Sequence, residues 1–190
     1  MKIRSVKFLK SAVKPEIFDS EKEIAMVGRS NVGKSSLINY LTNSKIAKKS
    51  STPGYTKLIN YFDVNNGDFL LVDLPGYGYS KAGKTASASW GPMIDGYLKD
   101  NPRIKNLLFL LDIRLEPNDD DMKMFEFMVF YNLPFTVVAT KCDKLSRAQI
   151  AIHKQKIATK LKIGIDNIYA VSSEKRMGAE ELLTRLDQFI

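Results

Sequence analysis

The sequence predicts an α/β fold in which helices cover both faces of a mostly parallel six-stranded sheet with one antiparallel edge strand. Apolar runs of strand length alternate along the chain with segments whose apolar residues recur at helical spacing. Two runs, 107–111 and 135–139, are almost continuously apolar, which is typical of strands covered on both faces. Strands that alternate with helices run parallel through right-handed crossovers, so the expected architecture is a three-layer sandwich.

The first strand is expected at 24–27, where an apolar run ends at a glycine and is followed by a helical pattern at 34–41. The next two runs, 58–64 and 69–72, are separated by Asn65-Asn66-Gly67-Asp68. This turn predicts a β-hairpin, because Asn and Gly accept positive φ.

The remaining elements follow from helical spacing and from capping residues. One more strand is expected at 168–171, and further helices are expected at 89–99, 119–131, 147–161 and 179–190. Asp119 and Ser146 are the expected N-terminal capping residues, and acids follow Asp119 in the first turn of its helix.

A chain of 190 residues that is 44% apolar is long enough for one sizeable core. We expect an extended arm at 1–20, which lacks a clear period, and a single domain at 21–190. No apolar run approaches the roughly 20 residues that cross a membrane, and no signal-peptide core is visible. The single Cys142 has no partner for an internal disulfide. We therefore expect a cytoplasmic monomer without stable membrane association.

The net charge of +8 is concentrated in two basic segments. Residues 1–50 hold eleven Lys or Arg against four Asp or Glu, and residues 141–165 hold seven against one. Such clustering favours phosphate-rich partners through counterion release, although a basic surface is also simply soluble.

Residues 28–35 match the pattern of a phosphate-binding loop, and they stand between a predicted strand and a predicted helix as that loop requires. We expect Lys34 to reach the β- and γ-phosphates of a nucleotide and the Ser35 hydroxyl to coordinate Mg²⁺. The alternative, a glycine turn without a ligand, is disfavoured because both pattern and position agree. The nucleotide-binding residues expected here are Arg29, Ser30, Asn31, Val32, Gly33, Lys34, Ser35 and Ser36.

A second motif, Asp73-Leu74-Pro75-Gly76, directly follows the apolar run 69–72. An acid at the carboxyl end of a strand can hold Mg²⁺, usually through water, and Gly76 can give its backbone N–H to the γ-phosphate. Alone, this pattern is usually a turn. Its place one strand after the phosphate loop predicts that Asp73 and Gly76 belong to the nucleotide site.

The third motif predicts that the base is guanine. Thr140, Lys141 and Asp143 follow the buried run 135–139. The Asp143 carboxylate can accept hydrogen bonds from the N1–H and the exocyclic amine of guanine, whereas adenine lacks this donor pair. The Lys141 stem can cover the base plane, and backbone N–H groups of Ser172 and Ser173 can close on the guanine O6. These motifs predict a P-loop NTPase with a Ras-like fold that binds GTP and GDP.

The segment 50–56 is polar and rich in turn residues, which suits a switch that responds to the nucleotide. A threonine in it can close on Mg²⁺ when a γ-phosphate is present. We favour Thr56 over Thr52 as this ligand, so the expected metal ligands are Ser35, Thr56 and Asp73.

With these motifs placed, the chain resembles the bacterial EngB GTPases, also called YihA or YsxC, in the Era-like branch of translation-associated GTPases. The resemblance covers about the whole chain from Lys14-Pro15-Glu16 onward. Its distinctive segments are Gly28-Arg29-Ser30-Asn31-Val32-Gly33-Lys34-Ser35-Ser36, Thr52-Pro53-Gly54-Tyr55-Thr56, Asp73-Leu74-Pro75-Gly76-Tyr77-Gly78-Tyr79 and Thr140-Lys141-Cys142-Asp143-Lys144. The resemblance implies a role in assembling the large ribosomal subunit or its precursors, with ribosomal RNA contacted through the basic segments, and a requirement for normal cell division and septation.

Two departures from the commonest GTPase pattern predict slow intrinsic hydrolysis. Thr140 replaces an Asn, as it does in the family, which removes one amide contact to the base. Tyr77 follows Gly76 where Ras-like proteins carry a water-orienting Gln. In relatives with Asn at the position of Asn31, that side chain helps to hold K⁺, and the alternative is that Asn31 only stabilises its own turn. The expected catalytic residues are Lys34, Asn31 and Gly76.

Other interpretations are weaker. A small-molecule P-loop kinase needs an Arg-rich lid, which the sequence does not show, and would leave Asp143 without a purpose. A nucleotide-independent RNA-binding module with a vestigial nucleotide site would not need the phosphate and Mg²⁺ residues. We expect His153 to lie at the surface without a catalytic role and Asp119–Asp121 to cap a helix rather than bind a metal. Side chains expected in helix packing or the core are Trp90, Phe125, Phe127 and Phe130.

Overall fold

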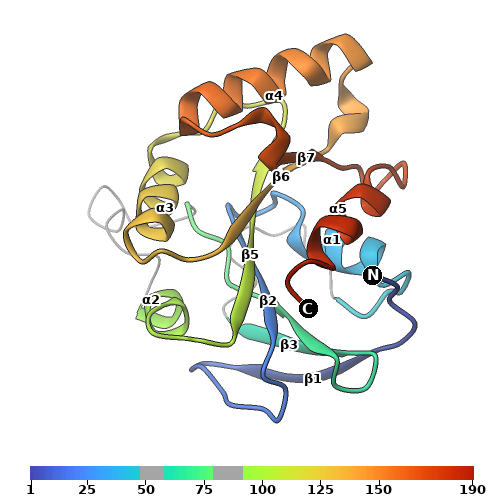
Figure 1. Ribbon diagram of the computed structural model, residues 1–190, viewed down its shortest axis with the longest axis vertical. Coiled ribbons are helices and arrows are strands. Elements are labelled where there is room, and N and C mark those ends of the chain that lie inside the picture. Colours follow the sequence, from blue (N-terminus) through green and yellow to red (C-terminus); the bar gives the residue numbers. More distant parts are fainter. Residues whose placement is uncertain (48–57, 79–91) are drawn as a thin grey trace.

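The computed structural model describes residues 1–47, 58–78 and 92–190 (Figure 1). Its strands are β1 (Val6–Ala12), β2 (Glu23–Gly28), β3 (Ile59–Val64), β4 (Phe69–Asp73), β5 (Ile104–Asp112), β6 (Phe135–Thr140) and β7 (Ile168–Ala170). Its α-helices are α1 (Lys34–Leu41), α2 (Pro92–Leu98), α3 (Asp119–Phe130), α4 (Arg147–Leu161) and α5 (Ala179–Leu186), with 3-10 turns at Cys142–Lys144 and Ile165–Asn167. Strands and helices alternate from β2 onward, apart from the β3–β4 hairpin.

The strands form one sheet in the order β1-β3-β4-β2-β5-β6-β7. β4, β2, β5, β6 and β7 pair in parallel, whereas β3 is antiparallel to both β4 and β1. In the described part of the chain, β3 is therefore the strand that runs against the others. The predicted fold class is confirmed, but the sheet has seven strands rather than six, because residues 6–12 of the expected arm pair with β3 at the sheet edge.

The β3–β4 hairpin forms where the sequence predicts it. Asn65, Asn66 and Gly67 all take positive φ, at 54°, 58° and 103°. The Asp63 carboxylate accepts a hydrogen bond from the Gly67 N–H at 2.7 Å, and the Asp68 N–H donates to the Val64 carbonyl at 3.1 Å. This turn needs residues that tolerate the left-handed region, which is why its Asn and Gly are informative.

Helices cover both faces of the sheet and complete the three layers (Figure 1). On one face, the apolar core includes side chains of α1 and α5, and the three residues predicted to share a face of α1 are all buried there. On the other face, the core includes side chains of α2, α3 and α4. The core residues of α1 are Leu37, Ile38 and Leu41. Every central strand is thus buried from both sides, as its continuous apolar run requires.

The helix starts agree with the sequence at one position and differ at another. Ser146 caps α4 in a reciprocal capping box with Gln149, as expected. In α3 the cap is Asn118 and not Asp119: the Asn118 side chain accepts from the Asp121 N–H, and the Asp121 carboxylate accepts from the Asn118 N–H. Asn118 is the cap because a capping box needs an acidic or amide side chain three residues after the cap, and Asp121 occupies that position. The residue three positions after Asp119 is Met122, which cannot accept a hydrogen bond in this way.

Some side chains lie elsewhere than the sequence predicts. Phe125 is buried in the core as predicted, but Phe130 at the end of α3 is 80% exposed. His153 on α4 is half-buried, in agreement with a position at the surface. Phe130 lies in the last turn of α3, beyond the part that packs on the sheet. Trp90 lies outside the described residues. Within the described residues, no helix is both long enough and apolar enough to span a bilayer.

Candidate functional site

The carboxyl ends of five parallel strands, β2, β4, β5, β6 and β7, meet along one edge of the sheet. In open α/β sheets this edge is where ligands bind. The phosphate loop, the motif at Asp73 and the motif at Thr140 all begin there, because each starts at or directly after the end of one of these strands. Gly28, Asp73, Asp112 and Thr140 are the last residues of β2, β4, β5 and β6.

The loop between β2 and α1 has the backbone geometry of an anion cradle. Asn31 and Gly33 take positive φ, at 64° and 115°, so successive N–H groups turn inward. Gly33 is also the N-cap of α1, and no side chain caps the first turn of that helix. Gly28 packs against β5, where an added Cβ would lie 2.7 Å from the Leu110 carbonyl oxygen. The free N–H groups at the start of α1 suit a phosphate.

Lys34 and Asp73 form a buried, oppositely charged cluster below this loop. The Lys34 ammonium lies 3.1 Å from the Gly28 carbonyl oxygen and 3.5 Å from that of Arg29. Burial lowers the pKa of Lys34 and raises the pKa of Asp73, and in each case the opposite charge partly offsets the shift. A bound anion would therefore stabilise the charged form of Lys34, and a bound cation would stabilise the charged form of Asp73.

Asp73 and Ser35 present oxygen ligands to the same space. The Ser35 hydroxyl donates to Asp73 Oδ2 at 3.0 Å, whereas the buried Asp73 Oδ1 has no hydrogen-bond partner among the described residues. An unsatisfied carboxylate oxygen beside a hydroxyl is a fitting donor set for a hard cation such as Mg²⁺, which binds proteins through few side chains and completes its shell with water and phosphate.

The segment after β4 lies directly against the phosphate loop. The Ser30 N–H donates to the Tyr77 carbonyl oxygen at 3.0 Å, and the Ser30 hydroxyl donates to that of Gly76 at 3.3 Å. A Cβ added at Gly76 would lie 2.8 Å from the Ser30 backbone, so this approach requires glycine. The two motifs are thus brought together as predicted.

The buried Tyr77 side chain connects the segment after β4 to α3. Its hydroxyl donates to Asp121 Oδ1 on α3 at 2.8 Å, and the side chain is buried. Burial and the neighbouring Asp121 raise the pKa of Tyr77 well above its usual value, so the phenol remains protonated at neutral pH. The residue that takes the place of a water-orienting Gln therefore faces α3.

The Thr140 side chain contacts the backbone of two neighbouring segments. Its buried hydroxyl lies 2.8 Å from the Val32 carbonyl oxygen and 3.1 Å from that of Leu111. It can donate its proton to one of them at a time. Thr140 thus ties β6 to the phosphate loop and to β5.

Asp143 and the loop after β7 come together at the far end of the same edge. The Ser172 hydroxyl donates to Asp143 Oδ1 at 2.6 Å, and the Lys144 ammonium lies 3.1 Å from Asp143 Oδ2. The Ser172 hydrogen bond lowers the pKa of Asp143, so its carboxylate is ionised. Ser173 follows in the same loop and is half-buried.

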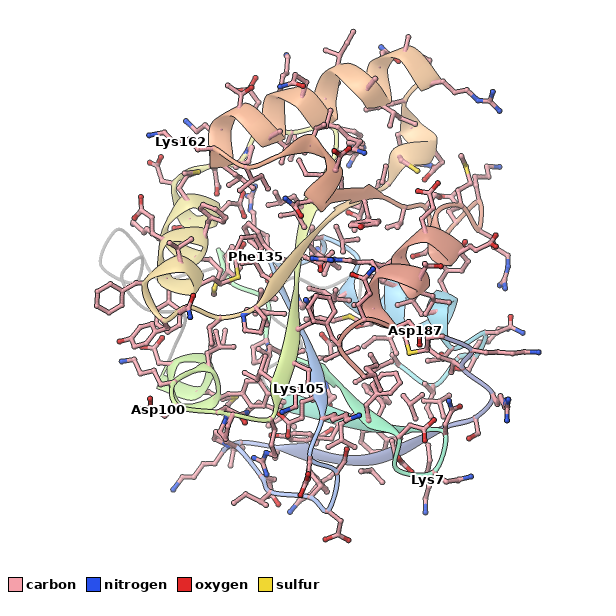
Figure 2. All side chains as sticks on the ribbon, viewed as in Figure 1. Lys7, Asp100, Lys105, Phe135, Lys162 and Asp187 are labelled. Atoms are coloured by element: carbon pink, nitrogen blue, oxygen red, sulfur yellow. The ribbon has the colours of Figure 1, made fainter. Side chains whose placement is uncertain are left out.

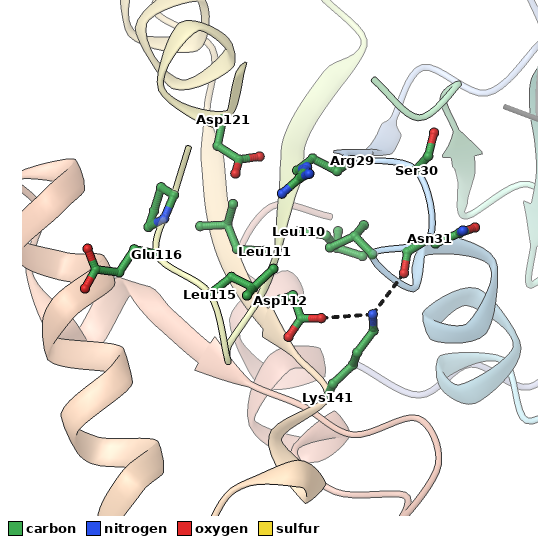
Figure 3. A pocket seen from close by; sticks show the side chains of 12 residues that line it. Arg29, Ser30, Asn31, Leu110, Leu111, Asp112, Leu115, Glu116, Asp121 and Lys141 are labelled. Carbon is green, nitrogen blue, oxygen red and sulfur yellow. Dashed lines mark hydrogen bonds and ion pairs between the residues drawn. The ribbon is translucent and has the colours of Figure 1, made fainter. Parts of the chain in front are cut away.

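Lys141 joins this end of the edge to the phosphate loop. Its ammonium donates to the Asn31 carbonyl oxygen at 3.0 Å and lies 2.9 Å from Asp112 Oδ2 (Figure 3). A pocket of about 190 Å³ lies beside these groups, between the phosphate loop, the end of β5 and the start of α3. The sequence analysis predicted Lys141 in the site but missed Asp112. A signal was present, because Asp112, like Asp73, is an acidic residue at the carboxyl end of a buried strand.

Thr52, Thr56 and the rest of the predicted switch, as well as Tyr79, lie outside the described residues. Within the described residues, the remaining predicted positions lie along the same sheet edge or in the loops that follow it.

Comparisons with known proteins agree with this geometry. Residues 23–141 match the model of a family described as 50S ribosome-binding GTPase. The probable GTP-binding protein EngB of Desulforamulus reducens is 47% identical over 194 residues, which cover 100% of this chain and 95% of that protein. The probable GTP-binding protein EngB of Clostridium kluyveri is 46% identical, with coverage of 100% and 98%. The chain belongs to the EngB family of GTP-binding proteins.

Solved structures support the fold of this EngB-family chain. A crystal structure of a probable GTP-binding protein EngB gives a TM-score of 0.71 at 22% identity, over 88% of this chain and 98% of that one. Era in complex with MgGDPNP and nucleotides 1506–1542 of 16S ribosomal RNA gives 0.65 at 24% identity, over 88% and 56%. These likenesses show a P-loop GTPase fold. As an EngB-type protein, the chain is a GTP-binding protein and a GTPase.

Proposed function

We propose that the protein uses GTP hydrolysis with Mg²⁺ as a conformational switch that assists assembly of the large ribosomal subunit in the cytoplasm, and that cell division and septation depend on it. The observation that carries the switch is the contact between the phosphate loop and the segment around Gly76, since this contact can report the presence of a γ-phosphate. We further propose that residues 21–190 act as one GTP-binding domain and that the protein works as a monomer.

The phosphates of GTP would be held by the Lys34 ammonium and by backbone N–H groups of residues 29–36 other than those of Ser30 and Val32, which donate to the carbonyl oxygens of Tyr77 and Arg29. Lys34 already lies buried at the loop, where a phosphate would replace the carbonyl oxygens that it now contacts. We assign the Mg²⁺ ligands to Ser35, Asp73 and Thr56. When bound, Mg²⁺ would neutralise charge on the β- and γ-phosphates. The unpartnered Asp73 Oδ1 supports this assignment among the described residues.

Guanine would be read by Asp143, with Ser172 and Ser173 closing on the base and the Lys141 stem covering it. The ionised Asp143 carboxylate is held by Ser172 and Lys144, so it is oriented before the base arrives. Thr140 acts here by supporting the phosphate loop through its hydroxyl, rather than by contacting the base.

Gly76 would give its N–H to the γ-phosphate, and Tyr77 would anchor this segment to α3 through Asp121. Because the buried Tyr77 hydroxyl is committed to Asp121, it does not orient an attacking water. Slow intrinsic hydrolysis follows from this arrangement, and an added cation or partner would speed it.

We propose that K⁺ is this added cation and that Asn31 helps to hold it. Asn31 lies in the left-handed region on the phosphate loop. Turnover of GTP by the purified protein should be about tenfold faster in KCl than in NaCl at the same ionic strength, because a fixed cation stabilises charge in the transition state. Asn31→Gly, which keeps the positive φ, should remove most of the difference. Equal turnover in the two salts would contradict the proposal.

β1 and α4 carry basic residues of the two different segments, and they lie at opposite ends of the molecule (Figure 1). Lys7 on β1 and Lys162 beside α4 are far apart (Figure 2). α4 contains four Lys or Arg and no Asp or Glu, whereas in the N-terminal segment Lys10 pairs with Glu16 at 2.7 Å. We therefore assign the main ribosomal RNA contact to α4, which carries no acid of its own and in which Lys156 pairs with Glu116 at 3.6 Å.

Co-sedimentation with ribosomal subunits and their assembly precursors tests this function. With a non-hydrolysable GTP analogue, we expect selective binding to the large subunit or its precursors, and weaker binding with GDP. A variant with Lys154, Lys156 and Lys160 changed to Gln should lower the slope of log affinity against log salt by about 2 to 3, since about one counterion is released per phosphate contact. Gln preserves helix propensity, so α4 should stay folded.

The matched control changes Lys7, Lys10 and Lys14 to Gln and removes the same charge from the other end. We expect it to alter the slope by less than half as much. Equal effects of the two variants, together with binding to every particle regardless of nucleotide, would show nonspecific electrostatics and contradict the assignment to α4.

A further inference from the structure

Asp112 lies at the centre of a chain of charged contacts that crosses the nucleotide edge. Arg114 donates to it through Nε at 2.9 Å and through Nη2 at 2.7 Å, one bond to each carboxylate oxygen. The Lys141 ammonium lies 2.9 Å from Oδ2 of the same carboxylate and also donates to the Asn31 carbonyl oxygen (Figure 3). Asp112 thus links the ends of β5 and β6 to the phosphate loop.

The geometry of this chain is specific. Asp112 pairs with Thr140 in the register of β5 and β6, so Lys141 begins just beyond the sheet at the position from which its side chain reaches back to Asp112. The Asp112 side chain is 10% exposed and that of Lys141 33%. Burial opposes ionisation of Asp112, but the hydrogen bonds from Arg114 and Lys141 outweigh it and lower its pKa to about 2.

A lysine side chain has four rotatable bonds, and without a fixed partner its stem samples many rotamers. Here the ammonium is held between a carboxylate and a backbone carbonyl, and the Lys141 backbone takes the left-handed region at φ 61°. The stem is therefore fixed before any base binds. Fixing it in advance removes an ordering penalty from nucleotide binding.

We infer that Asp112 is a positioning residue for guanine recognition, which acts by holding the Lys141 stem in the orientation that covers the base and by tying it to the phosphate loop at Asn31. The inference rests on the proposed role of Lys141. Arg114 supports Asp112 by fixing the plane of the carboxylate through its two parallel hydrogen bonds. In this inference Asp112 acts through Lys141 and has no contact of its own with the base or the phosphates.

A purely structural role predicts a different outcome and can be separated from this one. If the Asp112–Lys141 pair only stabilises the ends of β5 and β6, its removal should lower the stability of the nucleotide-free protein and affect binding only through folding. If Asp112 acts through Lys141, its effect on affinity should vanish once the Lys141 ammonium is removed. A double-mutant cycle measures this dependence directly.

The experiment measures the Kd for GDP and the thermal midpoint of the nucleotide-free full-length protein for Asp112→Asn, Lys141→Met and the double variant. Asp112→Asn should weaken GDP binding about tenfold, the loss expected for one charge-assisted hydrogen bond. In the Lys141→Met background the same change should alter the Kd less than about twofold. Glu116→Gln is the control, because Glu116 lines the same pocket but pairs with Lys156 instead.

Four outcomes overturn the inference. An unchanged Kd for Lys141→Met contradicts the proposed role of Lys141, and the inference with it. A loss for Lys141→Met without a loss for Asp112→Asn contradicts the inference alone. So does a full tenfold loss for Asp112→Asn in the Lys141→Met background, or a loss that follows a lowered thermal midpoint.

Asp112→Glu provides a second variant if Asp112→Asn does not fold. It keeps the charge but displaces the carboxylate by one methylene, so it should weaken GDP binding less than Asp112→Asn does. This smaller loss should also disappear in the Lys141→Met background. A loss that persists in the Lys141→Met background would contradict the inference here as well.

Discussion

Asp143→Asn is expected to weaken GTP binding at least about a hundredfold and to strengthen binding of xanthosine triphosphate, so that the base preference reverses. The Asp143 carboxylate only accepts hydrogen bonds, which matches the two donors of guanine, whereas an amide also donates and matches the carbonyl that xanthine carries at C2. Asn can still accept the hydrogen bond from Ser172, so the loop should keep its position.

Competition of GTP and xanthosine triphosphate against a fluorescent GDP analogue measures this reversal. Asp68→Asn in the exposed hairpin turn removes the same charge far along the chain from the site and should change neither affinity. Loss of GTP binding without any gain for xanthosine triphosphate would show that Asp143 supports the loop and does not read the base.

Lys34→Met is expected to weaken GTP binding by about 3 to 4 kcal/mol, or about two to three orders of magnitude, because the phosphates lose a desolvated cationic partner. The nucleotide-free protein should lose less than about 2 kcal/mol of stability, which is a smaller change than the loss of affinity. Removing Lys34 takes the counter-charge from the buried Asp73, but burial raises the pKa of Asp73, so this carboxyl can relieve the cost by taking up a proton. Met fills a similar volume.

Isothermal titration with GTP and chemical unfolding of the nucleotide-free protein give the two quantities separately. Lys45→Met, on an exposed lysine after α1, is the matched control and should leave both unchanged. A loss of stability as large as the loss of affinity would mean that Lys34 serves the fold and not the ligand.

The parts of the fold that sequence predicts are those set by local rules. The hairpin at Asn65–Asp68 depends on residues that tolerate positive φ, and the start of α4 depends on the Ser146–Gln149 pair, so both can be recognised from neighbouring residues. The phosphate loop is also local, since its glycines, Lys34 and Ser35 are contiguous.

The parts that sequence misses depend on partners or on broken periodicity. In β1 a register shift between Phe8 and Lys10 interrupts the alternation, so that Val6, Leu9 and Ala12 are the less exposed residues at every third position. This spacing does not resemble a strand. The Asp112–Lys141 contact was missed because it depends on the register of β5 against β6, which no local pattern specifies.

The position of β1 also bears on the order in which the chain can assemble. β1 is synthesised before its pairing partner β3, which begins only at Ile59. The five parallel strands can form their sheet without β1, because β1 pairs with β3 alone in the strand order. β1 is therefore added to the outside of a sheet whose other strands follow it along the chain, and it gains this pairing partner only once β3 is in place.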